Sequence, residues 1–165
     1  MIDSSFFMNT LLACFEAQFE SIHSRSVEVL SITDDEFLFR TPRDLPKTFA
    51  MFSIGEYVLR SAAAVEQTFG GITTKLWDDP FEWTLPEKLS TTHLILDYLD
   101  EVAETRRRGF TYFKSDADLS SVMPAPERLT SIFELLLNTV ARAEHFQGRA
   151  FAVFQFFSGA KLPRL

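Results

Sequence analysis

Residues 127–157 read ERLTSIFELLLNTVARAEHFQGRAFAVFQFF. Apolar residues recur in this stretch at intervals of three, four or seven positions, which is the spacing of one face of an α-helix. The pattern predicts a long helix from about Glu127 to Phe157, with Pro124 and Pro126 introducing its first turn. The residues expected to face inward are Leu129, Ile132, Phe133, Leu136, Val140, Ala143 and Ala150. Gly148 inside this helix is interpreted as a place of close backbone approach, or as room beside a pocket.

Three earlier stretches have the same periodicity and predict helices over about 5–30, 53–69 and 90–113. The first carries an apolar stripe that begins at Leu11, and the second opens with the capping-box pattern of Ser53 and Glu56 and ends at Gly70-Gly71. Thr33 and Glu36 form a second capping-box pattern, which predicts a one-turn helix. No useful length alternates with period two, so strands are not expected.

Four amphipathic helices with connections of about 15 to 20 residues predict an all-α four-helix bundle with long connecting loops. Residues 1–165 suit a single domain. Connections of this length also allow crossovers, so neighbours in sequence need not be antiparallel neighbours in space. The aromatic and acidic loop over residues 77–83 is either a packed surface loop or a lid over a pocket.

The charge and cysteine content exclude several classes of protein. The formal net charge is −7, so we expect neither nucleic-acid binding, which needs a basic face, nor binding to an anionic membrane surface. We interpret the run Arg106-Arg107-Arg108 as a solvated helix face. Cys14 is the one cysteine and has apolar neighbours, which predicts a buried structural thiol. The absence of a signal pattern and of a spanning apolar run predicts a cytoplasmic protein.

Several motifs occur together in an order that identifies a resemblance. They are LSITDDE at 30–36, FSIGE at 52–56, LDYLDEV at 96–102, and the last helix through Gly148 to GAKLP at 159–163. Over nearly the whole chain, their order and spacing resemble the DinB-like (YfiT-like) four-helix bundles. The resemblance implies the bundle fold and an ancestry among metal-dependent hydrolases and transferases.

Members of this family typically bind a divalent metal ion through three histidines, one on the second helix and two on the fourth at positions i and i+4. The resemblance places these positions at Tyr57, Arg142 and Phe146 in this chain. Phenylalanine cannot ligate a metal, and the permanently charged arginine would repel one. We therefore expect no metal, and a pocket lined by these three residues instead. If Arg142 faces the interior, its expected partner is Tyr57, Glu101 or Glu104.

A rebuilt metal site is the alternative. Glu56, Glu144 and His145 each stand one or two positions from an ancestral ligand position and could together bind zinc or nickel. His23 and His93 are not expected to be ligands, because no partner stands at a ligand spacing from either.

The sequence leaves two function classes open and does not decide whether the protein is an enzyme. The first is a binding or structural descendant of the metalloenzymes, without a metal, that forms a homodimer and holds a small organic ligand such as a carboxylate or phosphate near Arg142. The second is a hydrolase or thiol S-transferase with a rebuilt or metal-free site, in which Tyr57 beside Arg142 acts as a general acid.

Overall fold

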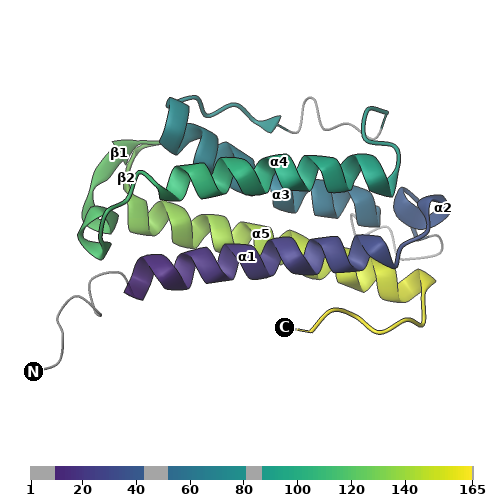
Figure 1. The fold of residues 1–165 in the computed structure, drawn as a ribbon. Helices are drawn as coiled ribbons and strands as arrows, with labels where there is room; N and C mark the ends of the chain where they lie inside the picture. Colours follow the sequence, from purple (N-terminus) through teal and green to yellow (C-terminus); the bar gives the residue numbers. More distant parts are fainter. Residues whose placement is uncertain (1–9, 43–51, 81–86, 165) are drawn as a thin grey trace, which may run out of the picture.

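In the computed structural model, four long helices lie side by side around a shared apolar core (Figure 1). The structure describes residues 10–42, 52–80 and 87–164. The long helices are α1 (Thr10–Ser31), α3 (Ile54–Thr74), α4 (Thr92–Phe110) and α5 (Ile132–Phe157). The shorter elements are α2 (Asp35–Leu38), the 3₁₀-helix η3 (Asp116–Ser120) and the strands β1 (Val122–Pro124) and β2 (Leu129–Ser131). The prediction of an all-α four-helix bundle is confirmed, apart from this small hairpin.

The helices occupy the corners of a square in an order that differs from their order in the chain. α1 and α3 each pack against both α4 and α5. Figure 1 shows that α1 and α5 run in one direction and that α3 and α4 run in the other. α3 and α5 are therefore antiparallel neighbours, and the chain crosses the bundle between α1 and α3. The long connections expected from the sequence make this order possible.

Helix starts follow local capping chemistry where that chemistry is present. The predicted capping box at α3 is confirmed: the Ser53 hydroxyl accepts from the Glu56 amide, and the Glu56 carboxylate accepts from the Ser53 amide at 2.9 Å. The capping box predicted for α2 is wrong, because the Thr33 hydroxyl donates instead to the Val29 carbonyl at 2.6 Å. α2 begins after Asp34, which makes no side-chain capping bond.

The start of α5 was predicted too early because residues 122–131 form the hairpin. Val122 pairs with Ser131 and Pro124 with Leu129 in an antiparallel register. Ser131 then caps α5 by accepting from the backbone amide three residues on. Leu129 is 68% exposed and Phe133 is 40% exposed, so the expectation that these two side chains face inward is wrong.

The glycines have roles other than those predicted. Gly70 and Gly71 do not end α3, which continues to Thr74 and stops at Lys75 in the left-handed conformation, with φ 59°. The ring of Trp77 packs so closely on Gly71 that an added Cβ would lie 2.5 Å from it. Gly148 faces open space, with no atom within 4 Å of an added Cβ, so neither role predicted for it is supported.

Three further expectations about exposure are wrong. Cys14 is exposed, and Leu11 is 48% exposed while Leu12 takes the buried place on α1. Arg106 is not solvated but 2% exposed, and its Nη2 donates to the carboxylate of Glu20. Among the described helices, none is both long and apolar enough to cross a membrane.

Candidate functional site

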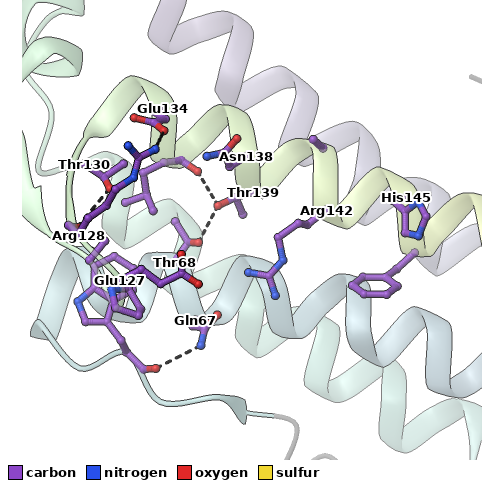
Figure 2. A pocket seen from close by; sticks show the side chains of 16 residues that line it. Gln67, Thr68, Glu127, Arg128, Thr130, Glu134, Asn138, Thr139, Arg142 and His145 are labelled. Atoms are coloured by element: carbon purple, nitrogen blue, oxygen red, sulfur yellow. Dashed lines mark hydrogen bonds and ion pairs between the residues drawn. The ribbon is translucent and has the colours of Figure 1, made fainter.

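A groove of about 710 Å³ lies between α3 and α5. Figure 2 shows Glu127 and Arg128 of the hairpin loop at one end and Arg142 and His145 of α5 toward the other. Phe146 of α5 also lines the groove, as does Trp77, whose ring packs on Gly71 near the end of α3. Figure 2 shows the Arg142 side chain extending from α5 toward α3. The size is within the range of small-molecule sites, which is roughly 300–1,000 Å³. The groove is therefore the leading candidate for a ligand site.

Arg142 lies where this groove meets a second hollow of about 90 Å³, which Arg60 and Asp79 also line. Its side chain is exposed, and no hydrogen bond or ion pair joins it to any described residue. The partners expected from the sequence are not used, since Glu104 pairs with Arg107 at 3.3 Å and Glu101 is exposed on α4. Arg142 thus presents its guanidinium to the groove.

Tyr57 is not part of the groove lining. Its side chain is 2% exposed, and its hydroxyl accepts from Arg149 Nη1 at 3.3 Å. The register of the antiparallel helices explains this position. Ser61 donates to the Ala143 carbonyl at 2.9 Å, so Tyr57, one turn before Ser61, faces the part of α5 that follows Ala143, where Arg149 lies. The expected pairing of Tyr57 with Arg142 as a general acid is therefore not formed.

The residues at the three positions where the resemblance implies ligands do not suit a divalent metal. Arg142 is a cation, Phe146 has no ligating atom, and the hydroxyl of Tyr57 is engaged by Arg149 away from both. Phe146 is half-buried beside Arg142 and forms part of the groove wall. The structure brings Arg142 and Phe146 together and leaves Tyr57 apart.

The alternative site of Glu56, Glu144 and His145 is not brought together either. Glu56 serves as the cap of α3, and Glu144 accepts from Arg25 Nη2 at 2.5 Å on the side of α5 that faces α1. His145 lines the groove alone of the three. Across residues 10–42, 52–80 and 87–164, no three His, Cys, Asp or Glu side chains are placed to hold a metal ion together.

The other two histidines lie away from the groove. His23 Nε2 lies 3.7 Å from Asp100 Oδ1, and the pKa of His23 is lowered, mainly because the imidazole is buried. His93 is on the surface of α4, 3.7 Å from Asp97. Neither placement contradicts the prediction that these histidines are not metal ligands.

The groove also has polar groups that the sequence did not indicate. Thr68 Oγ1 and Thr139 Oγ1 are 2.7 Å apart, and the Thr139 hydroxyl donates to the Leu135 carbonyl at 2.7 Å. Gln67 Nε2 donates to the Trp77 carbonyl at 3.2 Å. A threonine or glutamine in mid-helix carries no signal of function in a single sequence, so these residues could not be selected there.

At the hairpin end, the one arginine is already paired, and the charged side chains that line this end are one cation and two carboxylates. Arg128 donates to the carboxylate of Glu134, and both side chains line the groove (Figure 2). Glu127 also lines this end and is exposed. The positive charge in the groove that is left without a described partner is that of Arg142.

No family model matches this sequence, and no curated protein matches it. The fold does match a solved structure, that of a DinB-like protein from Bacillus cereus ATCC 10987. The two chains superpose with a TM-score of 0.71 over 92% of this chain and 95% of the other, at 14% sequence identity. The match shows a shared DinB-like fold.

Proposed function

We propose that this chain, which has the fold of a DinB-like protein, binds a small organic anion in the groove between α3 and α5 and does so without a divalent metal ion. The observation that carries the proposal is Arg142, a cation without a described partner in the lining of a groove large enough for a ligand. The guanidinium is permanently charged and has five N–H donors in a planar fork that suits a carboxylate or phosphate.

The surroundings of Arg142 suit the apolar part of such a ligand. Phe146 and His145 line the groove on the same helix, and their rings are in edge contact at 5.5 Å. Trp77 also lines the groove. Aromatic faces provide large apolar contact area, so they can bind the body of a ligand whose charged group bonds to Arg142.

The same charge disfavours a metal. A divalent cation beside Arg142 would be repelled, and no histidine stands at any of the three positions where the resemblance implies ligands. The ancestral chemistry of a metal-activated water or thiol therefore has no support from the residues that line this groove. A binding protein needs only the charge of Arg142 and the apolar lining of the groove. A metal-dependent enzyme would also need metal ligands, which this lining does not supply.

A second candidate function is a hydrolase or thiol S-transferase that works without a metal, and one observation favours it. His145 is exposed on the groove, and an imidazole there could accept a proton from a water or a thiol. Tyr57, the general acid expected from the sequence, bonds to Arg149, and Glu144, expected beside His145 in a rebuilt metal site, bonds to Arg25. We therefore place this function second. Turnover of a thiol or ester substrate that is lost in a His145→Ala variant would favour the enzyme function over the binding function.

The test is isothermal titration calorimetry with 3-phenylpropanoate, its uncharged amide, zinc chloride and nickel chloride. We expect the carboxylate to bind one per chain and the amide to bind at least about tenfold more weakly, since a hydrogen bond to a charged group contributes about 1.5–3 kcal/mol. Neither metal should bind stoichiometrically.

Two variants separate the groove from general charge effects. Arg142→Gln should weaken binding of 3-phenylpropanoate by about tenfold or more. Arg108→Gln is the matched control, because Arg108 is also exposed but lies on α4 outside the groove, and it should leave the affinity unchanged. Equal affinities in the wild type and Arg142→Gln, or one tightly bound zinc or nickel per chain, would overturn the proposal.

A further inference from the structure

The hydroxyl pair in the groove has a fixed donor direction. The Leu135 carbonyl has no proton, so Thr139 must donate in the contact between them at 2.7 Å. A hydroxyl has a single proton to donate, and that of Thr139 is used in this bond. Thr68 must therefore be the donor in its 2.7 Å contact with Thr139. Both protons are committed, and the Thr68 oxygen retains lone pairs that can only accept.

Gln67 adds a second acceptor, although one of the two N–H groups of its amide also remains available as a donor. Its Nε2 group donates to the Trp77 carbonyl at 3.2 Å, and its amide oxygen makes no hydrogen bond with any described residue. Gln67 and Thr68 are consecutive on α3, and both line the groove. The α3 side of the groove therefore offers acceptors where the α5 side offers the cationic donor Arg142 (Figure 2).

The distance between these two features suits one small molecule. Thr139 and Arg142 are three residues apart on α5, so they are neighbours on one helix face with Cβ atoms about 5–6 Å apart. Thr68 is bonded to Thr139 and therefore lies beside the same turn. A ligand that bonds its anionic group to Arg142 can reach this acceptor with a group only a few bonds away.

We infer that the groove selects a hydroxycarboxylate: an organic acid whose carboxylate binds Arg142 and whose hydroxyl donates to Thr68, with Gln67 beside it as a second acceptor. This inference rests on the proposed function, and it names the class of anion. A hydroxyl suits the position better than an ammonium group, because Thr68 is 4% exposed and a charge placed there would lose most of its hydration. An acid without a donor would leave these acceptors unsatisfied.

The experiment compares three probes by calorimetry: 3-phenylpropanoate, 2-hydroxy-3-phenylpropanoate and 3-hydroxy-3-phenylpropanoate. They share a carboxylate and a phenyl ring and differ in the presence and position of a hydroxyl. In the wild type, we expect one of the hydroxylated acids to bind at least about fivefold more tightly than 3-phenylpropanoate, which corresponds to one hydrogen bond of about 1 kcal/mol.

Variants assign that gain to Thr68. Thr68→Val keeps the shape and removes the acceptor, so the ratio of affinities between the hydroxylated acid and 3-phenylpropanoate should fall to about one. Thr73→Val is the matched control, because Thr73 lies on the same helix outside the groove and bonds only to the carbonyls of its own helix. Thr68→Ser retains the oxygen and should retain the gain, so it serves if the valine variant does not fold.

The outcomes separate this inference from the proposed function. If all three acids bind through Arg142 but neither hydroxyl tightens binding, the hydroxycarboxylate inference is wrong and the anion site stands. A gain that persists in Thr68→Val contradicts the inference in the same way. If none of the three acids binds, the proposed function fails together with it.

Discussion

Two glycine-to-alanine substitutions should change the stability of the bundle in opposite directions. Gly109 lies in the last turn of α4, and an added Cβ would be 2.4 Å from Cδ1 of Phe69. Phe69 is fully buried and its ring centroid is 5.2 Å from those of both Phe19 and Phe110. The ring therefore cannot move without displacing its neighbours. Gly148 on α5 is the matched case, because an added Cβ there would meet nothing within 4 Å.

The magnitudes follow from packing and helix propensity. Alanine in place of glycine in an exposed helix interior gains about 1 kcal/mol, so Gly148→Ala should raise the free energy of unfolding by up to about that amount. Overpacking a filled core costs about 1–3 kcal/mol. The clash at Gly109 is with the inner part of a fixed ring, so its cost should fall in the upper half of that range and leave a net loss of about 1–2 kcal/mol after the propensity gain.

Chemical denaturation and thermal scans of the wild type and both variants measure these differences. The two variants should be separated by about 2–3 kcal/mol, which for a chain of this size corresponds to roughly 4–12 °C in midpoint temperature. A Gly109→Ala variant as stable as the wild type would refute the argument, because it would mean that Phe69 is not held as the structure shows. A destabilised Gly148→Ala variant would refute the assignment of open space there.

Three further predictions concern charged groups outside the groove. Burial raises the pKa of Glu66, so the folded protein binds this proton more tightly than the unfolded chain, and stability should fall as pH rises from about 4.5 through the raised value. Glu66→Gln should remove this slope in urea titrations at pH 4 to 7 and be at least as stable at pH 7. Arg106→Met should stay within about 1 kcal/mol of the wild type or exceed it, since Nε and Nη1 of this buried arginine have no partner among the described residues; a loss above about 3 kcal/mol in the same assay would contradict this. Asp116→Ala should cost about 1 kcal/mol by denaturation, because the Asp116 carboxylate accepts from the first two amides after Thr10 in α1, each at 2.9 Å, as a capping group does.

Sequence predicted those parts of the fold whose physical cause is local. Ser53 and Glu56 satisfy each other's backbone amides within four residues, so the start of α3 was predictable from the pattern alone. The start of α5 was not, because it depends on whether residues 122–131 pair with each other in a hairpin. A helix that starts near Glu127 and a hairpin over residues 122–131 both place apolar residues at acceptable intervals. Only tertiary contacts decide between the helix and the hairpin.

Burial of individual residues depended on neighbours that are distant in sequence. Gly71 resembled a helix terminator, but the ring of Trp77 lies on it and the helix continues beneath that contact. Arg106 resembled its two neighbours in a basic run, but it is buried and pairs with a half-exposed Glu20 on another helix. Helical periodicity predicts the direction in which a side chain points. It does not predict which residues of other elements that side chain contacts.

The candidate site also has one part that local helix geometry predicts and one part that depends on tertiary contacts. Arg142 and Phe146 are four residues apart on α5, so their shared direction followed from helix geometry, and both line the groove. The position of Tyr57 relative to them depends on the register between α3 and α5, which a single sequence does not contain. The acceptor role of Thr68 depends on the direction of a hydrogen bond to Thr139, which requires atomic positions.

An exposed arginine is usually a solvated surface charge, and position distinguishes Arg142 from three other arginines that the structure describes. Arg106, Arg128 and Arg149 each donate to a carboxylate or a hydroxyl, whereas Arg142 lies between two hollows beside the ring of Phe146. A unit charge about 4 Å from the guanidinium is stabilised or destabilised by about 1 kcal/mol in water and about 4 kcal/mol near a protein surface. An anion should therefore be preferred to a cation of the same shape by about twice those amounts. Arg142→Glu should invert the preference, so that 3-phenylpropylammonium binds more tightly than 3-phenylpropanoate. An equal loss of both probes would show that Arg142 contributes shape to the groove and not charge.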